Sequence, residues 1–196
     1  MMRRLASLAV LYAFVVAGAG CASPRSNFYT LSPTPKPAAT AAAYSVAVGP
    51  VSVPATVDRP QIVVRVAPNQ VAIDEFNRWA SPLPDAIARV VAANLASMLG
   101  TPHVTVFSQP TAAGARYRVL IDVLAFDSVP GEAATLDAVW TVRSAREGAS
   151  RSGRTTGSEP VKDRDYATLA AAHSRALGRL SADLAEAIRA LEQAGG

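Results

Sequence analysis

The only cysteine of this 196-residue chain, Cys21, directly follows an apolar run near the N-terminus. Two arginines precede the run, residues 5–16 carry no charge, and residues 17–20 are small. This order is typical of a secretory signal peptide, and the run is shorter than the roughly 20 residues that a bilayer-spanning helix needs. We therefore predict a signal peptide over residues 1–20. Because one cysteine cannot form an internal disulfide, a hydrophobic core must hold the fold together.

The placement of Cys21 resembles that of the lipidated cysteine in bacterial lipoproteins, which becomes the N-terminus after cleavage. Ala19 and Gly20 match the small residues expected before it, whereas Gly18 replaces the usual leucine. The resemblance implies acylation of Cys21, palmitate included, and two or three acyl chains anchor a protein stably where one does not. Ala22, which is not aspartate, implies the periplasmic face of the outer membrane. The alternative is a buried Cys21 in an N-terminal helix.

The charge pattern argues against a nucleic-acid partner. The chain has 19 Lys and Arg against 15 Asp and Glu, and removal of the signal peptide deletes Arg3 and Arg4. The densest remaining basic group, between Arg143 and Arg154, is interrupted by Glu147. We interpret it as a solvated turn, since nucleic-acid binding requires a clustered basic stripe.

Residues 22–43 are predicted to form a spacer between the lipid and the domain. Three prolines between positions 33 and 37 favour an extended polyproline conformation. Phe28, Tyr29 and Leu31 interrupt the spacer, and a short strand docked on the domain is one interpretation of them. The predicted organisation is a signal peptide over 1–20, the lipidated Cys21 and tether over 21–43, and a periplasmic α/β domain over 44–194.

Hydrophobic periodicity within the domain predicts strands, a helix, more strands and a final helix. The first helix is expected to begin at Pro82, after Ser81 as its N-cap, and to end at Leu99 before Gly100. The last is expected from about Asp163 to Ala194. Strands are expected near residues 44–53, 61–66, 104–107, 117–126, 134–145 and 154–161, with an edge strand over 70–76. This order predicts an α/β fold, a mixed sheet with two amphipathic helices packed on it.

Several phrases in the domain resemble one family. They are Gly49-Pro50-Val51 followed by Pro54, Asp58-Arg59-Pro60-Gln61, Arg78-Trp79-Ala80-Ser81-Pro82-Leu83, and the aromatic pair Phe28-Tyr29. Together they resemble the ABC-type transport auxiliary lipoproteins of the PqiC/YmbA type. The resemblance covers roughly residues 21–191, and the second half matches only in layout.

This resemblance implies a sandwich related to the N-terminal domain of TolB-like proteins. It also implies a lipid-anchored accessory role beside an MCE-domain protein of an ABC system that moves lipids between the envelope membranes. Assembly of the chain into a homo-oligomeric ring is left open.

The sequence contains no pattern typical of a catalytic centre. A phosphate-binding P-loop, the G-x-S-x-G nucleophile motif and the H-E-x-x-H zinc motif are all missing. Asp122 and Asp127 are the carboxylate pair considered for a hydrolase, but five residues of strand place them on opposite faces. We therefore expect no enzyme activity, no metal and no cofactor.

Asp58, Arg59 and Trp79 are the candidate partner-docking residues. Asp58 and Arg59 either form a plain turn, or Arg59 docks a partner or a lipid phosphate, since its planar guanidinium suits phosphate. Trp79 either fills the core above the first helix or anchors an interface, where tryptophan is enriched.

Two roles other than docking remain as alternatives. The domain is a direct lipid carrier if a groove between the last helix and the sheet holds an acyl chain. A hydrolase acting on envelope polymers has the least support in the sequence.

Overall fold

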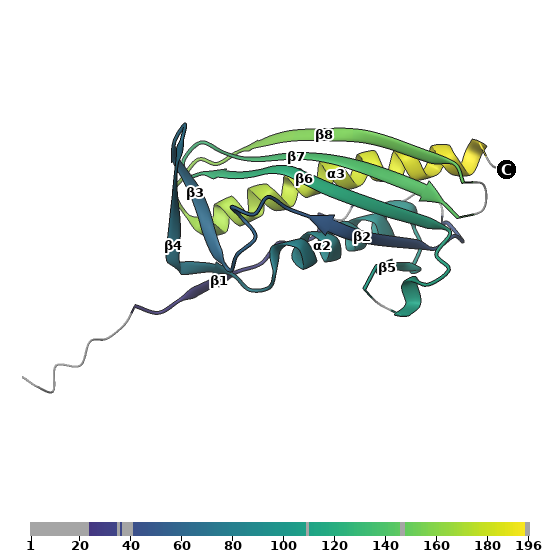
Figure 1. Ribbon diagram of the computed structural model, residues 1–196, viewed down its shortest axis with the longest axis horizontal. Coiled ribbons are helices and arrows are strands. Elements are labelled where there is room, and N and C mark those ends of the chain that lie inside the picture. The colour runs from purple at the N-terminus through teal and green to yellow at the C-terminus, as the bar shows by residue number, and fades with distance from the viewer. Residues whose placement is uncertain (1–23, 35, 37–40, 109, 146–147, 195–196) are drawn as a thin grey trace, which may run out of the picture.

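The computed structural model describes residues 24–34, 36, 41–108, 110–145 and 148–194. The predicted signal peptide and Cys21 lie outside the described residues. Two long helices, α2 (Leu83–Leu99) and α3 (Tyr166–Ala194), accompany two sheets (Figure 1). The strands are β1 (Asn27–Tyr29), β2 (Val46–Ser52), β3 (Gln61–Ala67), β4 (Gln70–Trp79), β5 (Val104–Val106), β6 (Tyr117–Val129), β7 (Ala133–Ser144) and β8 (Ser150–Pro160), and a short 3-10 helix, η1 (Pro110–Ala112), follows β5.

The larger sheet has five strands in the order β5-β2-β6-β7-β8. Strand β2 pairs in parallel with β5 and β6, while β6, β7 and β8 form an antiparallel meander. Helices α2 and α3 lie side by side against one face of this sheet (Figure 1). This arrangement confirms the predicted α/β fold with two helices on a mixed sheet.

The smaller sheet has three strands in the order β1-β4-β3, and it stands across one end of the larger sheet (Figure 1). The expectation of an edge strand over residues 70–76 is therefore wrong, because β4 is the central strand here. It pairs in parallel with β1 and antiparallel with β3. The alternating pattern of residues 70–76 could not reveal this position, since the partner strand β1 lies in the predicted spacer.

The core forms where the apolar stripes of both helices meet the inner face of the larger sheet. On α3, Leu177, Leu180, Leu184 and Ile188 recur at helical spacing, and each is 0% exposed. Full burial of such a side chain contributes about 1.5–3 kcal/mol to stability. These side chains pack between the last helix and the sheet, which is where the lipid-carrier alternative would require a groove.

A bulge in β6 changes which side chains share a face. The register of β6 against β7 shifts between Val123 and Ala125. Asp122 consequently pairs with Val139 and Asp127 with Thr135, two β7 positions that lie on the same side of the strand. The expectation that the two carboxylates point to opposite faces is wrong. They still do not converge, because Asp122 accepts a hydrogen bond from Ser52 and Asp127 forms an ion pair with Arg65.

The helix starts differ by one or two residues from those expected. Pro82 occupies the N-cap position of α2 without a side-chain capping bond, and the Ser81 hydroxyl instead accepts a hydrogen bond from Arg89. Asp165 caps α3, since its carboxylate accepts the Ala167 N–H at 3.2 Å. Asp163, the residue expected there, instead accepts the Asp165 N–H at 3.0 Å.

Much of the predicted spacer is part of the folded unit. Strand β1 pairs with β4, and Leu31 after it is 8% exposed in the core. The chain then crosses the two helices: the Ser32 N–H donates to Ser174 on α3 at 3.0 Å, and the Thr34 N–H donates to Asn94 on α2 at 2.8 Å. The folded unit therefore begins near residue 27, ahead of the expected boundary at residue 44.

We predict that Gly178 on α3 is small because this crossing segment lies against it. A Cβ at position 178 would overlap the hydroxyl oxygen of Thr34. Glycine to alanine in a helix normally adds about 1 kcal/mol to the free energy of unfolding, so Gly178→Ala should fall well short of that gain. In a Thr34→Ala background the same change should recover it, as measured by urea denaturation. Equal gains in both backgrounds would contradict the close approach.

Candidate functional site

Three of the four sequence phrases that carry the family resemblance meet in or beside the small sheet, whereas Gly49-Pro50-Val51 lies on β2 of the larger sheet. Arg78 on β4 pairs with Phe28 on one side and with Gln61 on the other. The Trp79 N–H donates to the carbonyl oxygen of Pro60 at 2.7 Å. Segments near residues 28, 60 and 78 are far apart along the chain, and only strand pairing brings them together. This end of the molecule is therefore the candidate site.

Trp79 is a core residue. Its side chain is 6% exposed, and its ring meets those of Phe126 and His173 edge-on at centroid distances of 6.2 and 6.4 Å. Such edge-to-face packing is a favourable geometry for buried aromatic rings. Of the two interpretations of Trp79, the structure supports the core one, and the ring is not available to a partner.

Asp58 and Arg59 lie on a turn at the foot of β3. The N–H groups of Val57 and Asp58 both donate to the carbonyl oxygen of Pro54, at 3.0 and 3.1 Å. Asp58 is exposed, whereas Arg59 is half-buried. The Arg59 Nε is fully buried and has no hydrogen-bond partner among the described residues. A buried donor without a partner costs free energy, so the turn holds Arg59 in an energetically unfavourable environment.

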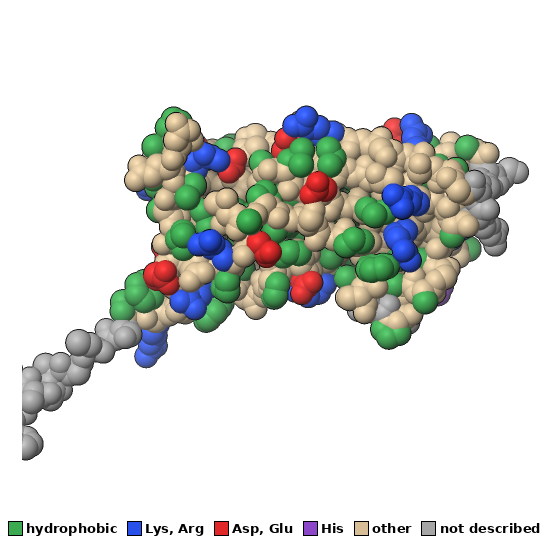
Figure 2. All heavy atoms as spheres, in the orientation of Figure 1, with side chains coloured by type: hydrophobic (Ala, Val, Ile, Leu, Met, Phe, Trp, Pro, Cys, Tyr) green, Lys and Arg blue, Asp and Glu red, His purple; other side chains and the backbone are tan. Residues whose placement is uncertain are grey.

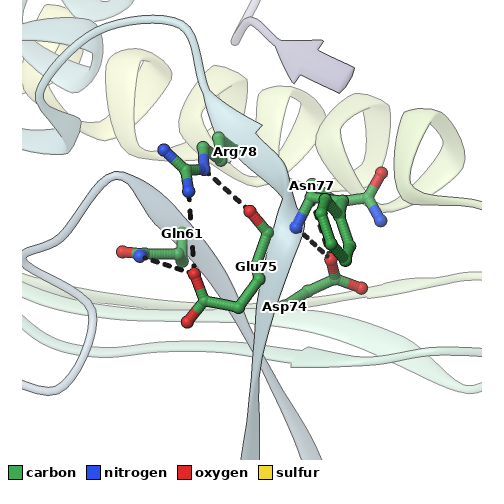
Figure 3. A network of polar contacts seen from close by, with 6 residues as sticks. Gln61, Asp74, Glu75, Asn77 and Arg78 are labelled. Carbon is green, nitrogen blue, oxygen red and sulfur yellow. Dashed lines mark hydrogen bonds and ion pairs between the residues drawn. The ribbon is translucent and has the colours of Figure 1, made fainter. Parts of the chain in front are cut away.

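Asp74 organises the inner side of the small sheet, and sequence analysis did not single it out. Its carboxylate accepts the N–H groups of Phe76 and Asn77, each at 2.9 Å (Figure 3). It also accepts the Tyr166 hydroxyl at 2.8 Å. Burial acts to raise the pKa of Asp74, but these bonds and the Asn77 side chain outweigh it and hold the pKa below its usual value. Burial and the bond to Asp74 raise the pKa of Tyr166 to about 12. The available signal was an aspartate inside a strand pattern, where aspartate is disfavoured.

A second polar group lies on the opposite side of β4. The Arg78 Nε donates to the backbone oxygen of Glu75 at 2.8 Å, and the Glu75 carboxylate lies 3.6 Å from the same guanidinium (Figure 3). Gln61 donates to that carboxylate at 3.4 Å. The side chain of Glu75 is 64% exposed, so this ion pair is screened by solvent and contributes little to stability.

Exposed apolar side chains concentrate at this end of the molecule. Among the described residues seven large hydrophobic side chains are exposed, and six belong to the small sheet or the adjoining part of β6: Phe28, Val66, Val71, Ile73, Phe76 and Leu124. Figure 2 shows hydrophobic surface both at the tip of the β3–β4 hairpin and beside β1. Concentrated apolar surface of this kind is typical of an interaction site.

A hollow separates the β3–β4 hairpin from β6. Its volume is about 210 Å³, and we call it the hairpin groove. Its lining includes Pro54, Val57, Val63, Arg65, Val71 and Leu124. Val57 directly precedes the Asp58-Arg59 turn in the chain, and the arginine that lines the groove itself is Arg65. A partner seated in the groove would cover the exposed side chains of Val71 and Leu124.

The one histidine–hydroxyl pair in the core is not arranged for catalysis. The Ser128 hydroxyl lies 2.8 Å from the His173 Nε2, but both side chains are buried and the His173 Nδ1 has no partner among the described residues. A nucleophilic serine requires an accessible hydroxyl and a base that a third group orients.

No group of three or more His, Cys, Asp or Glu able to hold a metal occurs in the part of the chain that the structure describes. Within the same residues, every helix is too short or too polar to span a membrane.

Comparison with known proteins places the chain among transport accessory proteins. The family model for the ABC-type transport auxiliary lipoprotein component matches residues 29–185. No curated protein sequence matches this chain. Two crystal structures share the fold at 21% sequence identity. One, of an uncharacterised protein, has a TM-score of 0.69 and covers 84% of this chain and 99% of its own. The other, from Xanthomonas campestris and assigned to family DUF330, has a TM-score of 0.63 and covers 87% and 100%.

These structural likenesses establish the fold alone, whereas the family model spans well over half of the sequence and begins within β1. Its lower bound agrees with the observation that β1 belongs to the folded unit. The chain therefore belongs to the family of ABC-type transport auxiliary lipoprotein components.

Proposed function

We propose that this protein is the lipid-anchored accessory component of an MCE-type ABC transport system that moves lipids between the envelope membranes. In this proposal Cys21 carries the lipid and holds the domain at the periplasmic face of the outer membrane. The domain acts by docking an MCE-domain protein, not by catalysis.

The observation that carries the proposal is the hairpin groove, which Val57 lines just ahead of the Asp58-Arg59 turn. Val71 and Leu124, which line the groove, are 41% and 46% exposed, and a partner would remove them from water. Arg59 is half-buried on that turn, and its guanidinium is the group proposed to meet an acceptor of the docked protein. Arginine is among the residues enriched in binding hot spots.

We predict that Arg59→Ala and Leu124→Asp each weaken co-purification of the MCE-domain protein by at least about 30-fold, the typical cost of losing a hot-spot residue. Arg151→Ala is the matched control, since Arg151 is an exposed arginine on β8, away from the groove. Cys21→Ala should leave the complex intact while releasing it from the membrane. If neither groove variant changes the yield of the partner, docking through this groove is wrong.

A further inference from the structure

The part of the small sheet nearest the N-terminus presents two exposed aromatic rings. Phe28 is 66% exposed and Phe76 is 41% exposed. Phe28 on β1 pairs with Arg78, which follows Phe76 by two positions on β4, so both aromatic residues belong to the paired part of β1 and β4. Strand β1 is also the outer strand of its sheet, with one edge unpaired among the described residues. Exposed aromatic rings close to an open strand edge are costly in water unless something covers them.

The length of chain before β1 indicates what covers these rings. Only six residue steps separate Cys21 from Asn27, the first residue of β1. Fully extended, six steps reach about 20 Å, and a flexible chain of that length spans about 13 Å on average. The spacer expected from the sequence, with a reach of about 70 Å at 3.1 Å per residue, would have left the orientation of the domain free. With β1 docked on the domain, an acyl anchor at Cys21 holds this end of the molecule next to the lipid headgroups.

We propose that Phe28 and Phe76 contact the lipid surface and orient the domain on it, an inference that rests on the proposed acylation of Cys21. Aromatic side chains favour the boundary between headgroups and acyl chains. The larger sheet then points away from the bilayer: β6 has 13 residues and is about 40 Å long. The C-terminus and β5 lie at the far end (Figure 1). Phe107, the remaining exposed large hydrophobic side chain, follows β5 and would stay in water.

The charges at this end indicate that the contact is apolar. Arg25 is exposed just before β1 and would be attracted to anionic lipid. The exposed Glu75 carboxylate lies beside Arg78 and opposes that attraction. Because Glu75 is paired with Arg78, these groups leave one net positive charge, at Arg25, and a single charge is far from a polybasic site. The contact should therefore depend on the rings and resist high salt.

The test uses the full, acylated protein in vesicles of phosphatidylethanolamine and phosphatidylglycerol with brominated acyl chains, at a low protein-to-lipid ratio. Phe28→Trp, Phe76→Trp and, as the matched control, Phe107→Trp each add one fluorophore to the two native tryptophans. We expect the added fluorescence at positions 28 and 76 to be quenched at least about twofold more than that at 107, since interfacial side chains lie within reach of the brominated carbons. The difference should persist at high salt.

Two outcomes overturn the inference in different ways. Protein that floats with the vesicles but shows equal quenching at all three positions is anchored without this contact. If Phe28→Ser then reduces co-purification of the MCE-domain protein, the rings face a protein partner and not the bilayer. Protein that fails to float overturns the acyl anchor in the proposed function and the inference with it. Loss of partner binding in the Arg59 variant is measured without vesicles, so the docking proposal stands or fails separately.

Discussion

Replacing Trp79 by alanine is expected to lower the free energy of unfolding by about 3–5 kcal/mol, as measured by urea denaturation. The indole is 6% exposed and fills the space between β4, Phe126 of β6 and His173 of α3. Its removal leaves a cavity where the small sheet joins the core, and this junction cannot collapse because the backbone of Trp79 is held by Pro60. A domain of this size has a total stability of about 5–15 kcal/mol, so the variant should be close to unfolding.

Trp79→Phe is the control for this prediction, because it retains an aromatic ring at the same position. We expect a smaller loss from this variant and normal partner binding. A variant that is as stable as the original protein but no longer binds the MCE-domain protein would show that Trp79 is an interface residue, against its observed burial.

Acidification from pH 7 to pH 4.5 is expected to lower the free energy of unfolding by about 3 kcal/mol because of His173. Complete burial lowers the pKa of His173 from 6.5 to about 3. Between these values the unfolded chain binds a proton that the folded protein does not, so stability falls as the pH falls below 6.5. Asp74 and Asp137 have lowered pKa values in the folded protein, and their contribution is lost only as the pH falls through the region of 3.8 and below.

His173→Gln separates this effect from general acid sensitivity. Glutamine retains a hydrogen-bonding group toward Ser128 but does not titrate. We expect the variant to show little change in stability between pH 6.5 and pH 4.5, whatever its stability at pH 7. An unchanged slope in the variant, measured by denaturation at each pH, would assign the acid sensitivity to other groups.

The two main helices and most strands could be predicted because their signals are local. The stripe that ends in Leu99 and Gly100 defines α2, and the stripe through Leu177, Leu180 and Leu184 defines α3, both at helical spacing. The lack of a catalytic motif and the family phrases were also readable from the residues. Two of the wrong predictions depended on strand pairing. A bulge in β6 places Asp122 and Asp127 on one face of the sheet, and pairing with β1 makes β4 a central strand.

In the candidate site, too, the sequence did not show which residues distant along the chain come into contact. Asp58 and Arg59 were singled out, and the structure shows them on a turn with the Arg59 Nε buried, while their docking role stays a prediction. The phrase around Trp79 was compatible with a core or an interface position, because an aromatic ring suits both. Asp74 was missed because its importance comes from Tyr166, which is distant along the chain.

The sequence by itself determined the fold class and the family, because periodicity, capping and turn residues act between neighbours along the chain. It also predicted a signal peptide and an acylation site at Cys21. Only the tertiary structure decided that β1 docks on β4, which shortens the chain between Cys21 and the domain to a few residues. The physical reason is that Phe28, Tyr29 and Leu31 are compatible with either a spacer or a docked strand. Only the edge of β4, which satisfies the backbone hydrogen bonds of β1, and the core, which accepts Leu31, decide between the two.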